Sequence, residues 1–117
     1  MPKDDLVYVG HMLETAQKAV SKAQAAGRTD FDNDENLRLA LTHLIQVIGE
    51  AAGSVSREFC AAHPEIEWKA VTGMRHKVVH DYMNVDEEVV WQTATSELPL
   101  LIAALAKLLP SDATSAQ

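Results

Sequence analysis

Apolar side chains recur at steps of three and four residues along most of this chain, and this rhythm limits its fold more than any other feature. The first stripe comprises Leu6, Val9, Leu13, Ala16, Val20 and Ala23. A second stripe comprises Leu37, Leu41, Leu44, Ile48, Ala51, Val55 and Phe59. An α-helix has about 3.6 residues per turn, so this spacing puts the apolar side chains on one helical face. The chain is therefore expected to be helical.

Two more helices are predicted in the second half. Because proline is tolerated in the first turn of a helix but not in its interior, a third helix should begin near Pro64. Its core stripe is Val71, Met74 and Val78, and the helix should continue through residue 82. Asp86 is expected to cap a fourth helix, which Pro99 should kink or split. The stripe of that helix is Val90, Ala94, Leu98, Leu101, Leu105 and Leu108.

The connections between these helices are short. Gly27 is a natural C-terminal stop, and "GRTDFDND" (residues 27–34) is predicted to be a turn-rich connection ending in an acidic cap for the second helix. The candidates for that cap are Asp32, Asn33 and Asp34. These elements predict an all-α fold, an antiparallel bundle of four to five helices. Residues 1–110 should form the domain, and residues 111–117 a polar tail.

Composition agrees with one helical domain. The chain has 117 residues, five glycines and four prolines, fewer turn residues than a β-sandwich requires. The lone Cys60 cannot form an internal disulfide, which favours a reducing, cytoplasmic setting. The N-terminal ten residues lack the apolar core of a signal peptide. The longest apolar run, "LPLLIAALAKLL", contains Lys107 and is shorter than a membrane span, so we expect a soluble protein without a membrane partner.

Charge is distributed unevenly. The formal net charge of −7 argues against broad, non-specific attraction to nucleic acid phosphates. Residues 68–80, however, contain Lys69, Arg75 and Lys77 and no acidic residue. An acidic protein with one local basic patch can bind a phosphate selectively, and Lys69 and Lys77 are candidate phosphate or RNA contacts.

The stretch "GMRHKVVHDY" (residues 73–82) allows three interpretations. His76 and His80 have the i, i+4 spacing of zinc-binding helices, but a third ligand is missing. They could equally be polar side chains on the exposed face of an ordinary helix. The third interpretation is RNA cleavage without a metal, in which a histidine takes the proton of the 2′-hydroxyl and an arginine holds the phosphate.

Geometry raises an objection to the third interpretation. On one straight helix Arg75 and His80 would lie about 140° apart, so they would converge poorly on one small ligand. A two-fold dimer would remove this objection by placing two copies of the helix around one cleft. Gly73, which has no side chain, would permit the close approach.

Three segments resemble the HepT-like toxins, which are ribonucleases of the HEPN domain superfamily. These segments are "LIQVIGEAA", "PEIEWKAVTGMRHKVVHDY" and "NVDEEVVWQ", in the family's order and approximate spacing. "MRHKVVHDY" looks like the family signature, an arginine, a polar residue, three variable positions, a histidine, one further residue and a tyrosine. The resemblance covers most of the chain and implies a HEPN-like helical bundle. It also implies a homodimer formed through the third and fourth helix region.

The resemblance further implies the roles of particular residues. Arg75 and His80 would be the catalytic pair, and His76 stands where the family commonly has asparagine. His76 could orient Arg75, touch phosphate or act as a second acid–base group. Tyr82 matches the tyrosine that a nucleotidyltransferase antitoxin modifies with AMP. Glu50 falls in the "GEAA" match, and we expect it to pair with Arg75 and orient the guanidinium.

The sequence thus predicts a cytoplasmic, homodimeric endoribonuclease, the toxin of a toxin–antitoxin pair, that needs neither a metal nor another cofactor. Its products should carry a 2′,3′-cyclic phosphate and a 5′-hydroxyl. The alternative is a catalytically silent HEPN module that binds a nucleotide or a nucleotidyltransferase partner and serves as scaffold or as AMPylation substrate at Tyr82. The net charge and His76 favour the alternative.

Overall fold

The computed structural model describes residues 2–81 and 84–109, with the backbone alone at residues 2, 3, 80, 81 and 84. The helices are α1 (Pro2–Asn33), α2 (Glu35–Gly53), α3 (Arg57–Ala62), α4 (Trp68–Thr72), α5 (Met74–Val78), α6 (Glu87–Gln92) and α7 (Leu98–Ala106), with a π-helical segment η1 (Thr93–Glu97) between the last two. Two short strands, β1 (Val79–Asp81) and β2 (Asn84–Val85), form an antiparallel hairpin. Tyr82 and the predicted tail at residues 111–117 lie outside the described residues.

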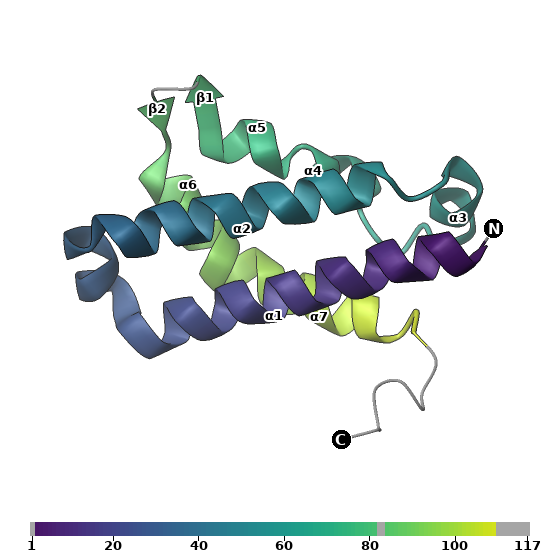
Figure 1. Ribbon diagram of the computed structural model, residues 1–117, viewed down its shortest axis with the longest axis horizontal. Coiled ribbons are helices and arrows are strands. Elements are labelled where there is room, and N and C mark those ends of the chain that lie inside the picture. The colour runs from purple at the N-terminus through teal and green to yellow at the C-terminus, as the bar shows by residue number, and fades with distance from the viewer. Residues whose placement is uncertain (1, 82–83, 110–117) are drawn as a thin grey trace.

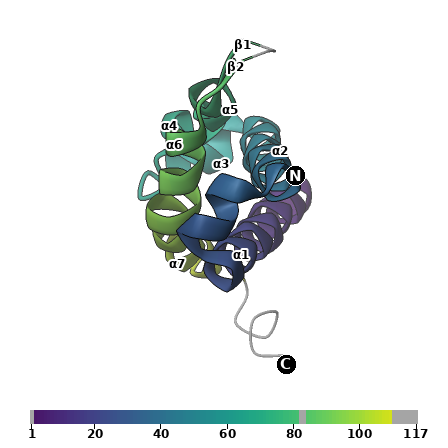
Figure 2. The same ribbon diagram turned by 90° about the vertical axis from the view of Figure 1, so that its left-hand side faces the viewer.

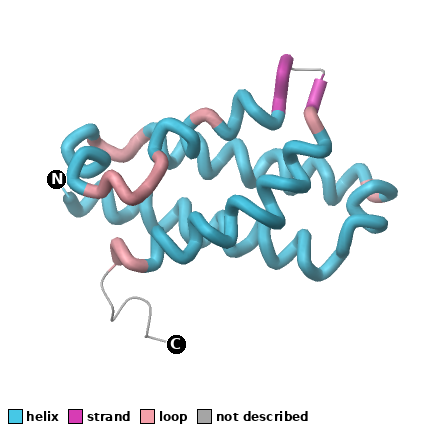
Figure 3. Tube along the Cα trace, turned by 180° about the vertical axis from the view of Figure 1, so that it is seen from behind, coloured by secondary structure: helices cyan, strands magenta, loops and turns pink. Residues whose placement is uncertain are grey.

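The two long helices α1 and α2 lie side by side and antiparallel, and α6, η1 and α7 cross them as one rod (Figure 1). Seen end-on, the helices surround a common interior, and the hairpin projects away from it (Figure 2). From behind, the two strands stand at one edge of an otherwise helical molecule (Figure 3). The largest fully buried side chains are Phe31, Met12, Leu41, Ile45, Ile48, Leu98 and Leu105. The predicted helical class is confirmed, and dimerisation stays a prediction.

The end of α1 differs from the prediction. Gly27 does interrupt the helix, because its backbone adopts φ 82° and ψ 170°, a conformation that glycine adopts without steric cost. The residues after it form helical turns up to Asn33 rather than a turn-rich connection. Asp34 alone links α1 to α2, and its carboxylate accepts a hydrogen bond from Leu37 N–H (3.2 Å), so one of the three predicted caps is confirmed.

The second predicted helix is interrupted after Gly53, which the sequence reading did not anticipate. Ser56 caps the separate helix α3, because its hydroxyl accepts a hydrogen bond from Phe59 N–H (3.1 Å). The buried carboxylate of Asp5 accepts hydrogen bonds from both Ser56 N–H and Ser56 Oγ, each at 2.8 Å. These bonds hold the start of α3 against α1 and stabilise a break that apolar periodicity does not reveal.

The third predicted helix is the largest correction. It begins at Trp68, four residues after Pro64, breaks at Gly73, and ends at Val78 instead of continuing through residue 82. Residues 79–81 are extended and pair with β2, with Val79 opposite Val85. Adjacent β-branched valines favour an extended strand, and the pairing satisfies backbone groups that a continuing helix would have used.

The fourth predicted helix is one rod in three parts. Asp86 caps α6 as predicted, because its carboxylate accepts a hydrogen bond from Val89 N–H (3.2 Å). The ring of Pro99 would crowd the carbonyl of Thr95 in a regular α-helix. We attribute the π-helical segment to this conflict, since a wider turn gives the ring room. The sequence predicted a kink or a split at Pro99; the regular α-helix is interrupted just before Pro99 by the π-helical segment, while the rod itself continues.

This rod also bears on the membrane expectation. Within the described residues, Glu87–Ala106 is a 20-residue helical stretch whose mean hydropathy of 1.3 and length would suffice to cross a membrane. The core helix of a globular protein meets the same two criteria. Val90, Ala94, Leu98, Leu101 and Leu105 of this rod are buried in the protein's own core. The stretch therefore carries no argument for a membrane.

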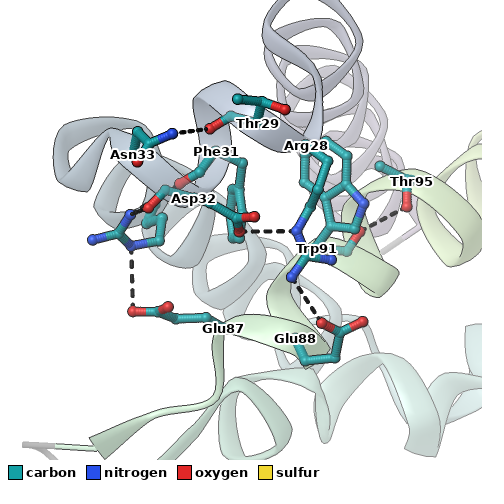
Figure 4. Close-up of polar contacts among 10 residues, drawn as sticks. Arg28, Thr29, Phe31, Asp32, Asn33, Glu87, Glu88, Trp91 and Thr95 are labelled. Carbon is teal, nitrogen blue, oxygen red and sulfur yellow. Dashed lines mark hydrogen bonds and ion pairs between the residues drawn. The ribbon is translucent and has the colours of Figure 1, made fainter.

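Two arginines at the junction of α1 and α2 bind the first turn of α6 (Figure 4). Arg28 contacts Asp32 and Glu88, each at 2.9 Å, and its guanidinium lies 5.8 Å from the ring centroids of Phe31 and of Trp91. The neighbouring Arg38 pairs with Glu87 (3.2 Å). We call the two arginines and these contacts the arginine clamp. The clamp fixes the helix that directly follows the hairpin.

Candidate functional site

Helix α5 presents three consecutive polar residues to solvent. Met74 and Val78 are buried and anchor the helix to the core, which confirms the predicted stripe. Arg75, His76 and Lys77 lie between them and are exposed. The short helix thus places the basic part of the sequence signature on the protein surface.

The position of Arg75 depends on a glycine of α2. A Cβ atom built at Gly49 would lie 2.8 Å from Arg75 Cγ and 3.3 Å from the Val71 carbonyl oxygen. The aliphatic stem of Arg75 therefore occupies space that any other residue at position 49 would fill. Gly49 lets α4 and α5 approach α2 closely, and the stem is held while the guanidinium remains outside.

A surface depression of about 490 Å³, called the first hollow here, adjoins this contact. It is lined by Gly49, Glu50, Gly53, Ser54, Thr72, Gly73, Arg75 and His76. Its hydroxyl groups already donate to backbone carbonyls, Ser54 Oγ to Glu50 (3.4 Å) and Thr72 Oγ1 to Lys69 (3.1 Å). The first hollow brings together three predicted site residues, Glu50, Arg75 and His76.

The expected ion pair between Glu50 and Arg75 is not formed. Both side chains line the first hollow, yet within the described part of the chain neither makes an ion pair or a side-chain hydrogen bond. A guanidinium has five N–H donors in a planar fork that fits the oxygens of a phosphate. No described residue occupies the donors of the Arg75 fork.

The two predicted lysine contacts lie elsewhere. Lys77 Nζ is 3.5 Å from Glu97 Oε2 on η1, and Lys77 does not line the first hollow. Lys69 is exposed on α4 and is also absent from the lining. The basic patch seen in the sequence is thus divided, and the structure brings only its arginine together with His76 and Glu50.

His80 belongs to strand β1, where the backbone alone is described, and Tyr82 lies outside the described residues. The strand follows α5 directly, and Asp86 N–H donates to the Val78 carbonyl (2.7 Å) where the hairpin rejoins the helices. Because the helix ends at Val78, the i, i+4 spacing of His76 and His80 does not place them on one helical face. The angle of about 140° between Arg75 and His80, which assumed a continuous helix, no longer applies.

Metal-ligating clusters and shifted pKa values are features that can mark a functional site. Among the described residues, no group of three or more His, Cys, Asp or Glu side chains is placed to hold a metal ion. The pKa of Arg28 is raised by hydrogen bonds to Glu88 and Asp32 in the arginine clamp. Burial raises the pKa of the Cys60 thiol, and hydrogen bonds from its own backbone and from His63 lower the pKa of Glu65. These three groups lie outside the first hollow.

Gly49 is the functional residue that sequence reasoning missed. The available sequence signal was the segment "GEAAG", in which Gly49 and Gly53 lie four residues apart and therefore on one helical face. Two glycines on one face leave a bare strip of helix, which is a signal for close approach of another segment or of a ligand.

The candidate site is thus a surface hollow on a helical bundle, lined by two glycines of α2 and by Glu50, Arg75 and His76. A guanidinium fork at such a place has the geometry to bind an anion. A family profile described as "Ribonuclease HepT-like" matches residues 12–108. The chain belongs to the HepT-like ribonuclease family. The resemblance inferred from the three sequence segments is thereby confirmed.

Curated relatives agree with this assignment. The "Probable ribonuclease HepT" of Thermococcus cleftensis is 35% identical over 68% of this chain and 72% of its own length. A protein of Caldanaerobacter subterraneus named "Putative RNase" is 29% identical over 90% of this chain and 94% of its own. One with the same designation from Methanocaldococcus jannaschii is 31% identical over 85% of this chain and 83% of its own. No solved structure gave a significant match.

Proposed function

We propose that the chain is an endoribonuclease that cleaves RNA without a metal, with Arg75 and His80 as its catalytic pair. The family and the names of the relatives support the reaction class. The observation that carries the proposal is the Arg75 guanidinium, held by its stem on Gly49 and unpaired among the described residues. An arginine whose donors are satisfied would have nothing to offer a phosphate.

The reaction is an in-line displacement at phosphorus. His80 takes the proton of the 2′-hydroxyl as the 2′-oxygen–phosphorus bond forms. Arg75 neutralises the charge that grows on the equatorial phosphate oxygens. The bond to the 5′-oxygen breaks and that oxygen receives a proton, which leaves a 2′,3′-cyclic phosphate and a 5′-hydroxyl. A second proton carrier is therefore needed besides the His80 that acts as base.

A homodimer would supply that carrier. Two copies related by a two-fold axis would bring two His80 residues to one cleft, one acting as base and one as acid. The hairpin supports this arrangement, because it carries His80 away from the interior of its own bundle (Figure 2). Dimerisation would thus complete the active site rather than merely enlarge the protein.

The same proposal includes a partner that silences the enzyme. The family signature places Tyr82 two residues after His80, and an antitoxin nucleotidyltransferase would transfer AMP to it. A bulky anion beside the catalytic histidine would exclude the RNA phosphate by occupying space and by charge repulsion. The pair would act in the cytoplasm as a toxin and its antitoxin.

The direct test incubates the purified protein with RNA in the presence of a chelator. We expect cleavage to persist, products to end in 2′,3′-cyclic phosphate, and His80→Ala to abolish the reaction. His43→Ala is the matched control, because His43 is exposed on α2 and does not line the first hollow. Loss of cleavage on chelation, or full activity in His80→Ala, would refute the mechanism.

A second variant tests which role His76 has in the reaction. His76 lines the first hollow beside Arg75, where the family commonly has asparagine. If His76 only supplies a polar contact, His76→Asn will keep most of the activity. If His76 is the proton donor to the leaving oxygen, His76→Asn will lose the alkaline limb of the pH–rate profile and most of its activity.

The alternative is a catalytically silent module that serves as scaffold or AMPylation substrate. The net charge of −7 favours it, because a strongly acidic protein repels the RNA backbone. Co-purification with a nucleotidyltransferase, AMP on Tyr82 and no RNA cleavage by the unmodified protein would select this function. Cleavage by the unmodified protein would reject it.

A further inference from the structure

A second depression lies across α2 from the first hollow. It measures about 270 Å³ and is lined by Tyr8, His11, Glu14, Thr15, Val47, Glu50, Ala51 and Ser54. Glu50 and Ser54 line both depressions. We call this depression the second hollow.

Helical geometry explains how the two hollows are related. At about 100° per residue, Glu50 and Ser54 form the ridge of the exposed face of α2. Gly49 and Gly53 fall on one side of that ridge, in the first hollow. Val47 and Ala51 fall on the other side, where α1 supplies the opposite wall. A ligand bound at Arg75 that extends past the Glu50 ridge therefore enters the second hollow.

The second hollow has an aromatic wall. The rings of Tyr8 and His11 lie on α1 with centroids 6.5 Å apart at an interplanar angle of 80°. Tyr8 is half-buried and His11 is exposed, so ring surface remains open to a ligand. Val47 and Ala51 add apolar surface. Aromatic rings with apolar neighbours are the surroundings in which unstacked nucleobases bind.

Charge decides which part of an RNA strand fits. Glu14 and Glu50 line the second hollow, and within the described residues neither carboxylate has an ion pair or hydrogen bond. Two unpaired carboxylates repel a phosphate but accept hydrogen bonds from the amino and imino groups of a base. The first hollow shares Glu50 but adds Arg75 and His76, so it offers a cationic group that the second hollow lacks among its lining residues. The first hollow is thus suited to a phosphate, and the second hollow to the base next to it.

We propose that the second hollow is a nucleobase subsite for the RNA strand whose phosphate binds Arg75. Tyr8 stacks on the base, His11, whose ring stands at 80° to that of Tyr8, contacts the base from the side, and the Glu50 carboxylate accepts hydrogen bonds from its edge. Guanine fits best, because its N1–H and N2 amino group donate side by side to one carboxylate. The proposal rests on RNA as the substrate, and it makes Glu50 a specificity residue rather than a partner of Arg75.

Binding of an uncleavable strand tests the subsite apart from catalysis. The probe is a fluorescent 2′-O-methyl hexamer alternating guanine and adenine, whose attacking hydroxyl is blocked, measured by anisotropy with the full-length protein. We expect Tyr8→Leu to weaken binding about 10-fold and Tyr8→Phe to leave it unchanged, since stacking needs the ring and not the hydroxyl. His43→Ala is the control for a general change in surface charge.

The role of Glu50 is isolated by a double-substitution cycle. Replacing guanine with inosine removes the N2 amino group, and Glu50→Gln replaces one carboxylate oxygen with a donor. Guanine-to-inosine exchange should weaken binding to the unmodified protein about 5- to 10-fold and to Glu50→Gln hardly at all. Equal losses in the two proteins, or Tyr8→Leu binding as tightly as Tyr8→Phe, would overturn the subsite.

The outcomes separate this inference from the proposed function. If natural RNA is cut but the cycle shows no coupling, the ribonuclease stands and the nucleobase subsite is wrong. If the coupling is present but RNA is not cut, the subsite stands and the catalytic proposal is wrong. Circular dichroism of each variant, which should match the unmodified protein, excludes loss of fold as the cause.

Discussion

Arg28 and Arg75 are both exposed arginines, but their surroundings differ completely. The Arg28 guanidinium contacts Asp32 and Glu88 at 2.9 Å and lies over two aromatic rings. The Arg75 guanidinium has no partner among the described residues, although its stem is fixed against Gly49. An arginine with satisfied donors holds elements together, whereas one with a fixed stem and free donors is prepared for a ligand. The contrast predicts where a substitution affects stability and where it affects activity.

The largest effect is expected at Arg75. Arg75→Ala should lower the rate of RNA cleavage about 100- to 1,000-fold, because the growing phosphate charge loses its donor. Its melting temperature should match that of the unmodified protein, since the Arg75 side chain makes no hydrogen bond or ion pair with a described residue. Arg75→Lys keeps the charge but loses the fork and should recover only part of the rate. An Arg75→Ala variant that melts at a lower temperature but cleaves RNA normally would show that Arg75, like Arg28, stabilises the fold and does not act on the substrate.

Gly49→Ala tests whether the stem of Arg75 must be held in place. The added methyl would lie 2.8 Å from Arg75 Cγ, so the side chain must shift. We expect cleavage to fall between about 10- and 100-fold, because small displacements of a catalytic group are costly. Gly10→Ala is the matched control, since a Cβ there meets nothing within 4 Å. Equal activity in the two variants would show that the contact does not position Arg75.

Arg38 tests the other half of the comparison. Its guanidinium donates to the backbone carbonyls of Phe31 (2.9 Å) and Asp32 (2.8 Å) and pairs with Glu87. Arg38→Ala should lower the free energy of unfolding by about 1–2 kcal/mol, because the carbonyls lose a charged donor. Urea unfolding measures this loss. Arg57→Ala, an exposed arginine of α3, should change stability by less than about 0.5 kcal/mol.

The smallest effect concerns Cys60, which belongs to neither region. Burial raises the pKa of its thiol, so less thiolate is present at neutral pH than in a free cysteine. Alkylation by iodoacetamide at pH 7.5 should therefore be slow in the folded protein and faster in urea. The alkylated protein should cleave RNA normally, and a loss of activity would connect α3 to the site.

Periodicity predicted the parts of the fold that depend on local residues. The stripe of Val71, Met74 and Val78 is buried as expected, and Asp34 and Asp86 cap the helices they precede. A helix cap can be predicted from sequence because one side chain bonds to a backbone N–H only three residues away.

The hairpin was missed because its cause lies beyond the three- and four-residue steps that helical periodicity examines. Apolar residues in "KVVHDYMNV" continue a helical rhythm, so the sequence favours a helix through residue 82. Pairing between Val79 and Val85 and the bond from Asp86 N–H to the Val78 carbonyl override that preference. The basic patch predicted from sequence is divided because Lys77 pairs with Glu97, a residue twenty positions away that the local charge pattern does not include. Motif spacing identified Arg75 and His76, but only packing showed that the Arg75 stem lies against Gly49 and that both side chains line a hollow with Glu50.

The long part of α1, which ends at the kink at Gly27, is joined to α2 by a short segment, residues 27–34, and this shortness has a kinetic consequence. Closing so small a loop costs little chain entropy, so the two long helices can find each other early in folding. The segment from α4 to β2, which contains the proposed catalytic residues, must dock onto that helical pair afterwards. Pulse-labelled hydrogen exchange should therefore protect amides of α1 and α2 before those of α4 and α5. A nascent chain would then form the α1–α2 scaffold before the segment that contains Arg75 and Gly73 docks onto it.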